Sequence, residues 1–384
     1  MRIGLFTDTY LPTVDGVVNS LLTTRKTLEG MGHDVFVCAP EDKKNGNPPD
    51  EKAIYCKARE FKKYPGYRMA KVFSDRLTLA MRDYEPDLMH SHGVAVVGMK
   101  SMWASRELRV PYVLTFHTMV LDALNYYSPL KLNVSFVGWL VRRYLRFFLH
   151  RCRGVVVPTS AIAREVRALA PRVKMMEVIP TGIDTKRFNT NVSGREVREA
   201  WDLDGNDVVL HVGRLSPEKN VNTLLGAFYL VKKEKPEAKL MFVGSGPDMD
   251  NCQRHAHKLG LDDDVIFAGF IDDEMLPNYY AACDAFAITS KFETQGLVVL
   301  EAMATGKCVA GVNFRAIPEF VKDGETGFLF EPDNPFDCSR AVIRALEFNG
   351  GLKTETRRMA ERYSVETCTE KLVKFYETLI ENAK

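Results

Sequence analysis

The chain has 384 residues, of which 46% are hydrophobic and 27% are charged. These fractions are typical of a soluble globular protein and exclude an intrinsically disordered chain, while the length predicts two or three domains. Eight cysteines are scattered without a CxxC pair, so neither a zinc knuckle nor a disulfide framework is indicated. The first residues lack the long apolar run of a secretory signal, which predicts a cytoplasmic protein.

The net charge of +2 conceals an uneven distribution. Residues 1–190 contain 29 Lys and Arg against 18 Asp and Glu, or +11, which leaves 23 of the 52 basic and 32 of the 50 acidic residues for residues 191–384. The basic first half points to an anionic partner such as a membrane surface, a nucleic acid or a phosphorylated substrate. A chance imbalance on a solvated surface explains the charge alone equally well.

Short apolar runs alternate with amphipathic stretches in the first half, as in a parallel sheet built from βαβ units. We predict helices at Val17–Met31 and Ser74–Asp83. The predicted buried strands are Ile3–Thr7, Asp34–Cys38, Leu88–Ser91, Tyr112–Phe116 and Gly154–Pro158.

The pattern restarts after a turn-rich segment between Ile179 and Trp201, which predicts two doubly wound α/β domains, at residues 1–185 and 186–364, and then a final helix within residues 365–384. The second set of predicted strands is Val208–Val212, Lys239–Val243, Val265–Ala268, Ala285–Ile288 and Cys308–Gly311. The predicted helices are Val221–Glu234, Pro247–Leu259, Glu274–Ala282, Gly296–Thr305 and Val365–Asn382.

Ligands of parallel sheets bind beyond the carboxyl ends of the strands, so the loops there are candidates for a site. Gly16 precedes the first helix, where a backbone amide could approach a phosphate, although a single glycine in such a loop is more often only a turn. Arg214 and Lys219, in GRLSPEKN after a strand, could hold a diphosphate from two sides. Surface solubility would explain either cation singly.

The segment FETQGLVVLEA places Glu293 and Glu301 eight positions apart, with Glu301 on a helix that begins near Gly296. Glu301 lies among apolar neighbours and therefore needs a hydrogen-bond partner. The alternative is that Glu293 is an N-terminal helix charge and Glu301 is exposed. The backbone amides that would meet a phosphate or a sugar hydroxyl at the start of this helix are those of Thr294, Gln295, Gly296 and Leu297.

These motifs, in this order, resemble the retaining glycosyltransferases with the GT-B fold. Glu293 and Glu301 resemble the E-x7-E motif of that family, Arg214 and Lys219 its cationic pair, and Gly16 its N-terminal glycine loop. The resemblance covers essentially the whole chain. It implies two Rossmann-like domains that face each other across a cleft and a C-terminal helix that crosses back onto the first domain.

The resemblance also implies roles for individual residues. Arg214 and Lys219 would stabilise the leaving nucleotide diphosphate, Glu301 would bind the ribose hydroxyls, and Glu293 with the amides of residues 294–297 would hold the donor sugar. His117, in TFHT, matches a histidine that steadies the sugar, although a lone histidine after a strand is otherwise more often structural. Phe270 and Ile271, in FAGFID, match the backbone segment that meets the nucleotide base.

No metal or other cofactor is expected. Asp248 and Asp250 form the D-x-D pattern of metal-dependent transferases of another fold, but they lie in the first turn of a predicted helix, where aspartate favours the helix dipole. We interpret them as capping residues. Helix N-termini and the Arg214 and Lys219 side chains can supply the electrostatic stabilisation that a metal would supply.

The segment LNVSFVGWLVRRYLRFFL, residues 132–149, is the candidate acceptor and membrane region. Arg142, Arg143 and Arg146 argue against a membrane-spanning helix. Their combination with Trp139 and other aromatic residues suits the headgroup region of an anionic bilayer. A second basic and aromatic cluster covers residues 57–71. A buried helix of the first domain with arginines at its edge explains residues 132–149 equally well.

Within the family, the segments FTDTYLPTVDGV and TFHTMVLDALNYYSP look most similar to diacylglycerol glucosyltransferases and less similar to phosphatidylinositol mannosyltransferases. The predicted function is transfer of glucose from UDP-glucose to a lipid hydroxyl, with retention, by a peripheral enzyme on the inner face of the cell membrane. The alternatives are GDP-mannose or another donor, with a phosphoinositide, sugar-phosphate or polysaccharide acceptor. A nucleic-acid-binding protein would explain the basic half but not the two glutamates, so no nucleic-acid partner is expected.

Overall fold

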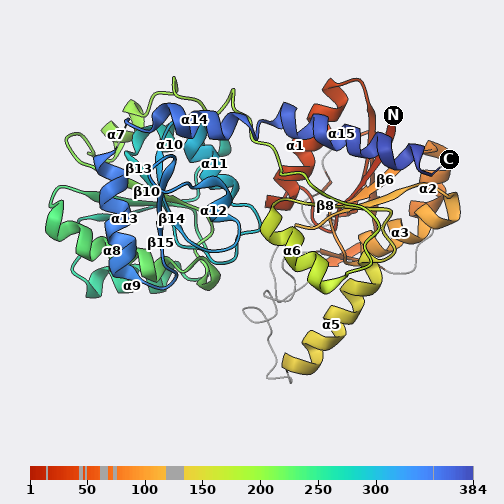
Figure 1. The fold of residues 1–384 in the computed structure, drawn as a ribbon, viewed down its shortest axis with the longest axis horizontal. Helices are drawn as coiled ribbons and strands as arrows, with labels where there is room; N and C mark the ends of the chain where they lie inside the picture. The colour runs from red at the N-terminus through yellow and green to blue at the C-terminus, as the bar shows by residue number, and fades with distance from the viewer. Residues whose placement is uncertain are drawn as a thin grey trace. The chain divides into compact units, whose positions relative to one another are not determined.

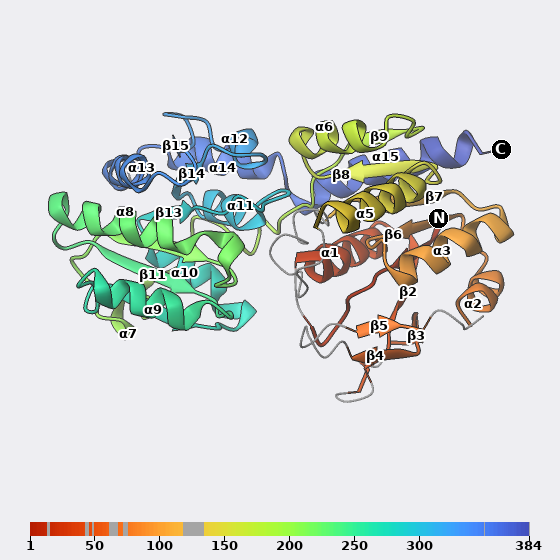
Figure 2. The ribbon, with the colours of Figure 1, turned by 90° about the horizontal axis from the view of Figure 1, so that it is seen from below.

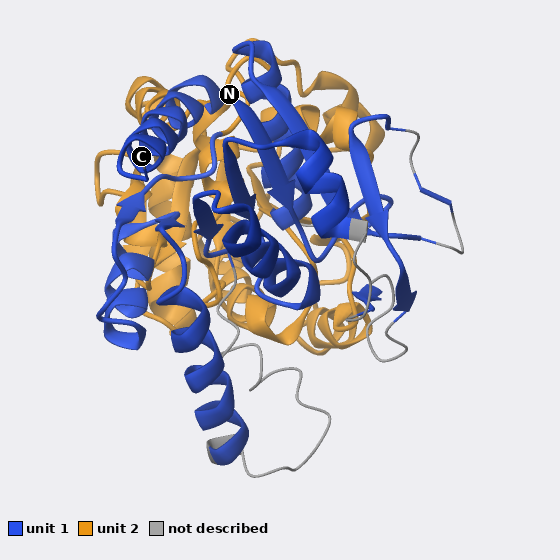
Figure 3. Cartoon of the chain, turned by 90° about the vertical axis from the view of Figure 1, so that its right-hand side faces the viewer, with its two compact units in different colours: residues 1–182, 365–384 blue, residues 183–364 orange. Residues whose placement is uncertain are grey.

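The computed structural model describes residues 1–13, 16–42, 46–47, 50–60, 68–71, 76–117, 134–348 and 350–383, and Figure 1 and Figure 2 show the chain from two sides. The chain divides into two compact units, coloured separately in Figure 3. Unit 1 comprises Met1–Gly182 and Val365–Lys384, and unit 2 comprises Ile183–Ser364. The final helix therefore belongs to unit 1 although it follows unit 2 in the sequence.

Unit 1 contains a seven-stranded parallel sheet of order β3-β2-β1-β6-β7-β8-β9, with a short antiparallel β4-β5 pair. Its strands are β1 (Arg2–Phe6), β2 (Asp34–Pro40), β3 (Ala53–Cys56), β4 (Ala58–Glu60), β5 (Arg68–Ala70), β6 (Leu88–Ser91), β7 (Tyr112–Thr115), β8 (Gly154–Val157) and β9 (Met176–Val178). Its helices are α1 (Gly16–Gly30), α2 (Arg76–Tyr84), α3 (Val96–Leu108), α5 (Val134–Leu149), α6 (Ser160–Leu169) and α15 (Val365–Glu381).

The final helix α15 completes the core on one face of the first sheet. It packs beside α1, and in Figure 1 the sheet lies between these two helices above and α6 below. Alternate strand side chains such as Ile3 and Leu5 point toward this face. The spacing of the α15 side chains gives one apolar stripe. The buried side chains on that stripe are Leu372, Phe375, Tyr376 and Leu379. The predicted return of the C-terminal helix to the first sheet is confirmed.

Truncation of one α15 side chain tests this core. Leu379 is fully buried, and we expect Leu379→Ala to lower the free energy of unfolding by about 2–5 kcal/mol through lost burial and a residual cavity. Glu370→Ala, at an exposed position of the same helix, is the control and is expected to change it by less than about 0.5 kcal/mol. Denaturant unfolding of both variants measures the difference. Equal effects would contradict the docking of α15 on the first sheet.

Unit 2 contains a six-stranded parallel sheet of order β12-β11-β10-β13-β14-β15. Helices α8, α9 and α13 lie together on one face, and α10, α11 and α14 lie on the other (Figure 1). The strands are β10 (Val208–Val212), β11 (Lys239–Val243), β12 (Val265–Gly269), β13 (Ala285–Ile288), β14 (Cys308–Val312) and β15 (Gly327–Phe330). The helices are α7 (Arg195–Ala200), α8 (Val221–Glu234), α9 (Met249–Lys258), α10 (Leu276–Ala282), α11 (Leu297–Ala304), α12 (Ile317–Phe320), α13 (Pro335–Glu347) and α14 (Lys353–Glu361).

Each sheet has a point at which the strand order reverses. In unit 1 this point lies between β1 and β6, and in unit 2 it lies between β10 and β13. In open parallel sheets, ligands bind at this switch point, outside the carboxyl ends of the strands. The two switch points are therefore where the candidate residues of each unit are sought.

None of the helices in the described part of the chain combines the length and the apolar character that crossing a membrane requires.

Candidate active site

Lys219 and Glu293 meet at the switch point of unit 2. Lys219 ends a short 3-10 turn after β10, and Glu293 lies in the loop after β13. The Lys219 Nζ donates to Glu293 Oε1 at 2.6 Å, and the two side chains are 24% and 15% exposed. The hydroxyl of Thr289, at the end of β13, donates to the Lys219 carbonyl oxygen at 3.0 Å. The pairing of neighbouring strands therefore positions both ends of this ion pair.

The ion pair keeps Glu293 ionised. Burial raises the pKa of Glu293, but the Lys219 charge and hydrogen bonds from Lys219 and Ser290 outweigh it, so this pKa lies below its ordinary value. His211, buried in β10, donates through Nδ1 to the Ala287 carbonyl oxygen at 3.0 Å, and burial lowers its pKa to about 4. The site thus holds one paired carboxylate and one ammonium at neutral pH.

Helix α11 begins directly after the Glu293 loop. Gly296 is its N-cap residue, with a φ of +83°, and a side chain there would be strained and would meet Ile317 at 3.0 Å. Gln295 is buried, and Thr294 lies between it and Glu293. The start of a helix carries partial positive charge, so this loop places a carboxylate and a helix N-terminus next to each other.

Glu301 has the hydrogen-bond partner that its apolar surroundings require. The Tyr280 hydroxyl, on α10, donates to Glu301 Oε2 at 2.7 Å. Burial raises the pKa of Glu301 to about 7, against lowering contributions from the Tyr280 hydrogen bond and the Arg187 charge. Arg187 is itself paired with Asp273, at 2.7 Å between the Arg187 Nη1 and Asp273 Oδ2. Sequence reasoning missed Tyr280 and Arg187, which only the fold brings to Glu301.

The raised pKa of Glu301 predicts a pH-dependent stability difference. Between its ordinary pKa of 4.5 and about 7, the native protein binds more protons at Glu301 than the unfolded chain does, so this contribution to stability is lost as the pH rises through that window. We expect the stability of the wild type relative to Glu301→Gln to be lower at about pH 8 than at about pH 5. Denaturant titrations of both proteins measure this, and a pH-independent difference would contradict it.

The remaining predicted donor residues lie at the same edge of the second sheet. The loops after β10 and β11 are joined by a hydrogen bond from the Leu215 amide to the Ser245 carbonyl oxygen at 3.1 Å. A Cβ on Gly246 would come within 2.1 Å of the Leu215 carbonyl oxygen, so this approach requires glycine. Arg214, in the first loop, is exposed. Phe270, which is 78% exposed, and Ile271 directly follow β12.

Gly16 and His117 belong to unit 1. Gly16 begins α1, and no atom of the described residues lies within 4 Å of a Cβ built on it, so their packing does not require glycine there. Asp8, after β1, accepts hydrogen bonds from the amides of Ala95 and Val97 at 2.8 Å each. This carboxylate therefore occupies the start of α3.

His117 follows β7 and meets His92, which follows β6. His92 Nδ1 and His117 Nε2 are 2.8 Å apart. His90, inside β6, bonds through its two nitrogens to Tyr376 at 2.5 Å and to Thr115 at 2.6 Å. The predictions included His117 but missed His92, although HSH directly after an apolar run was a signal for polar groups at the end of a strand.

Helix α5 exposes one apolar and cationic stripe. Figure 1 shows it projecting from the sheet of unit 1. Its C-terminal half is anchored by buried Leu145 and Phe148, whereas its other face is exposed. The Arg143 guanidinium lies 5.7 Å from the Trp139 ring centre, and Arg146 Nε donates to the Leu169 carbonyl oxygen at 2.9 Å. The exposed side chains, including Arg142, are Phe136, Trp139, Leu140, Arg142, Arg143, Arg146 and Phe147. Helix α5 is therefore neither wholly buried nor wholly exposed.

Asp248 is the N-cap residue of α9, and Asp250 lies in its first turn. The Asp248 side chain accepts from the Asn251 side-chain amide at 2.6 Å and makes no capping bond to the helix backbone. Within the described ranges, no three His, Cys, Asp or Glu side chains are grouped to hold a metal ion.

Comparisons with known proteins agree with this architecture. The family described as "Glycosyl transferases group 1" matches residues 195–365, and "Glycosyltransferase Family 4" matches residues 14–187. The alpha-monoglucosyldiacylglycerol synthase of Streptococcus pneumoniae is 33% identical over 353 residues, which cover 90% of this chain and 78% of that protein. A GDP-mannose-dependent alpha-mannosyltransferase of Corynebacterium glutamicum is 27% identical, over 86% of this chain and 77% of that protein.

Among solved structures, that of the Anabaena protein HepE in complex with UDP-glucose superposes with a TM-score of 0.77 and 21% identity, covering 98% of this chain and 99% of that chain. The two parallel α/β units, the returning C-terminal helix and these matches confirm the predicted fold class and family. The chain belongs to the glycosyltransferase group 1 family and has the GT-B fold.

Proposed function

We propose that this glycosyltransferase is a retaining enzyme that moves glucose from UDP-glucose to a membrane lipid hydroxyl such as that of diacylglycerol. The observation that carries the proposal is the Lys219–Glu293 pair at the switch point of unit 2, directly before the start of α11. This pair supports the assignment of Lys219 to the leaving diphosphate and of Glu293 to the donor sugar. Glu301, which the Tyr280 hydroxyl holds in place, is assigned to the ribose, and Phe270 and Ile271 are assigned to the base.

The charges of the site suit the reaction. Negative charge on the nucleotide diphosphate grows as its bond to the sugar breaks, so Lys219 and Arg214 would act mainly in the transition state. The diphosphate of a bound donor would compete with Glu293 for the Lys219 ammonium. It would draw the ammonium away from Glu293 and toward the leaving group. His117 is assigned to the sugar. Because these groups supply the charge stabilisation, the proposal includes no metal ion.

The lipid acceptor is supported by two observations of different kinds. The S. pneumoniae relative is named for monoglucosyldiacylglycerol synthesis. Helix α5 exposes Phe136, Trp139 and Leu140 next to Arg142 and Arg143, a combination that suits the interface of an anionic bilayer. We therefore propose a peripheral enzyme on the inner face of the cell membrane.

The test is to incubate the protein with UDP-glucose or GDP-mannose in the presence of diacylglycerol vesicles or a soluble sugar phosphate. The proposal expects release of UDP and formation of an α-linked glucolipid, identified by the anomeric proton coupling in the NMR spectrum. Use of GDP-mannose, as the C. glutamicum relative's name states for that protein, would replace the donor assignment. A β-linked product would overturn the retaining mechanism, and transfer only to the soluble acceptor would overturn the lipid assignment.

Chelation tests the metal-independent part of the proposal. Since Lys219 and Arg214 carry the charge stabilisation, we expect transfer in excess EDTA to stay within about twofold of the untreated rate. Initial rates with and without EDTA measure it. A loss of transfer that Mg²⁺ or Mn²⁺ restores would contradict the expectation and direct attention back to Asp248 and Asp250.

A further inference from the structure

His92 holds the imidazole of His117 at the carboxyl edge of the first sheet. His92 Nδ1 lies 2.8 Å from His117 Nε2, and the two rings meet edge to edge and are nearly coplanar, with centres 5.1 Å apart and planes 18° apart. His92 is 4% exposed, whereas His117 is only partly buried. His117 is thus the more exposed member of the pair, and His92 contacts its ring from the buried side.

A single proton lies between the two imidazoles, in the hydrogen bond that joins His92 Nδ1 and His117 Nε2. Burial lowers the pKa of His117 to about 4 and that of His92 well below its ordinary value, so both rings are neutral at pH 7. A neutral imidazole has one N–H and one acceptor nitrogen. If His117 Nε2 donates to His92 Nδ1, the proton of His92 is on Nε2 and His117 Nδ1 is an acceptor. If His92 Nδ1 donates, both assignments reverse. His92 Nε2 and His117 Nδ1 therefore always have opposite roles: when one is a hydrogen-bond donor, the other is an acceptor.

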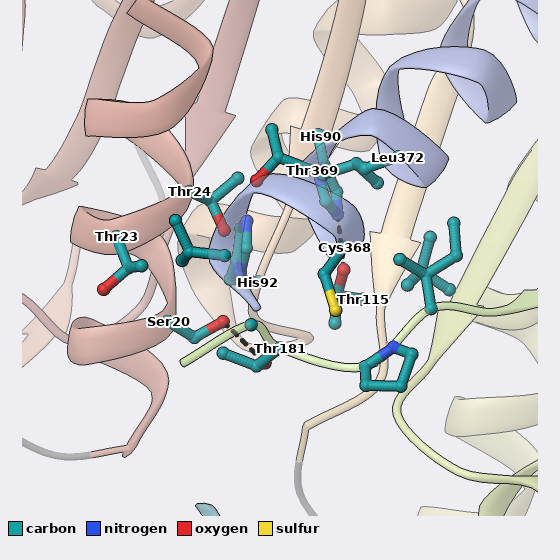
Figure 4. A pocket seen from close by; sticks show the side chains of 15 residues that line it. Ser20, Thr23, Thr24, His90, His92, Thr115, Thr181, Cys368, Thr369 and Leu372 are labelled. Atoms are coloured by element: carbon teal, nitrogen blue, oxygen red, sulfur yellow. Dashed lines mark hydrogen bonds between the residues drawn. The ribbon is translucent and has the colours of Figure 1, made fainter. Parts of the chain in front are cut away.

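A small cavity, lined by both polar and apolar side chains, lies beside His92 (Figure 4). Its volume of about 30 Å³ has room for about two water molecules. Its lining includes His92 and the hydroxyls of Ser20, Thr24, Thr115 and Thr369, and Figure 4 shows these side chains gathered around the space. His92 Nε2 is buried and has no hydrogen-bond partner among the described residues. Buried polar atoms are nearly always paired, which makes this nitrogen a site for a bound water.

We propose that His92 is a positioning residue for sugar transfer, which fixes the orientation of the His117 ring through the bond between His92 Nδ1 and His117 Nε2 and is itself held by a water at His92 Nε2 in this cavity. The inference rests on the proposed function, which assigns His117 to the donor sugar. The neighbouring His90 lines the same cavity, and its ring centre lies 4.4 Å from that of His92, so it belongs to the same cluster. Leu379 is the control, because it is equally buried in unit 1 but packs at Gly154, the first residue of β8, at the opposite edge of the sheet.

Three substitutions of His92 separate its two ends. His92→Phe keeps the ring and removes both nitrogens, His92→Asn keeps an amide near the position of Nδ1, and His92→Gln keeps one near Nε2. We expect His92→Phe and His92→Gln to lower kcat about 10²-fold, with the donor KM within about threefold of the wild type, because a misplaced contact group acts mainly on the reacting geometry. His92→Asn is expected to recover kcat to within about tenfold of the wild type.

The control is Leu379→Ala, which we expect to lower the unfolding midpoint while kcat stays within about threefold. An equal kcat loss in Leu379→Ala and His92→Phe would mean general damage to the core and would overturn the proposal. Wild-type kcat in His92→Phe would overturn it as well.

Nitrogen-15 NMR of the histidine-labelled wild type gives a readout that does not depend on activity. We expect a coupling across the hydrogen bond between His92 Nδ1 and His117 Nε2. Absence of that coupling would overturn the proposal, even if the variants do not fold. If the wild type transfers sugar from no donor, the proposed function fails, while the spectra still test the link between His92 and His117.

Discussion

Replacement of Lys219 by alanine is expected to lower kcat about 10²–10³-fold, the effect of removing one group that stabilises developing charge. Its Nζ lies 2.6 Å from Glu293 in a site that is largely shielded from water, so no solvent ion replaces it fully. Arg214→Ala is expected to act in the same direction. Glu301→Ala is expected to raise the donor KM instead, because the ribose contact is made in the ground state as well. Steady-state kinetics of the three variants measure both constants.

The matched control is Lys232→Ala. Lys232 pairs with Asp264 at 2.9 Å, with side chains 17% and 21% exposed, and Asp264 also pairs with Lys239 at 3.0 Å, so loss of Lys232 disturbs a similarly buried ion-pair cluster of the same unit. Asp264 directly precedes β12, which places that pair at the opposite edge of the sheet from Lys219. We expect Lys232→Ala to keep the wild-type kcat. If Lys219→Ala and Arg214→Ala also keep it and change only the KM, their assigned role is wrong.

Vesicle binding by unit 1 is expected to weaken about 10²-fold when Arg142, Arg143 and Arg146 are replaced together by glutamine. Each cation near an anionic bilayer contributes roughly 1 kcal/mol, so three contribute roughly 3 kcal/mol. The bond from Arg146 to the Leu169 carbonyl oxygen makes Arg142 and Arg143 the larger contributors. Co-sedimentation with phosphatidylglycerol vesicles, at low salt and at about 1 M salt, where the Debye length falls to about 3 Å, measures the binding.

The control removes the same charge elsewhere in unit 1. Lys26, on α1, and Lys371 and Lys374, on α15, are exposed, and their triple glutamine variant should bind vesicles like the wild type. The exposed Phe136, Trp139 and Phe147 predict a remainder of binding that salt does not remove. If the wild type does not bind the vesicles at low salt, or if both triple variants bind them equally, the peripheral-membrane proposal fails. A soluble acceptor then becomes the better hypothesis.

The buried central strands could be predicted from the sequence, because both of their faces are covered and their apolar runs are continuous. The predicted bounds of β6, β10, β11 and β13 agree with the structure. The edge strand β9 could not be predicted in this way, since its three residues are exposed or half-buried. Helix α13 was missed although Asn334 caps it and Pro335 begins it, which are helix-start signals in the sequence.

The individual residues of the site could be predicted from the sequence, but the contacts between them could not. Lys219 and Glu293 were each assigned to the donor from their motifs, yet their ion pair joins positions 74 apart and exists because β13 lies beside β10. The bond from Tyr280 to Glu301 depends in the same way on the packing of α10 near α11. The His92–His117 pair requires β6 and β7 to be neighbours. A motif indicates which groups are present, and strand order decides which of them meet.

The return of α15 to unit 1 makes unit 2 an insertion within the chain of unit 1, which has a consequence for synthesis on the ribosome. Residues 183–364 form one continuous segment with its own core, so unit 2 can fold as soon as that segment has emerged. Unit 1 has no complete core until Phe375, Tyr376 and Leu379 are made. One apolar face of its sheet is therefore covered only in part, by α1, while more than 180 further residues are translated. The nascent chain is thus most exposed to aggregation and to chaperones through its N-terminal half, and the last helix ends that exposure.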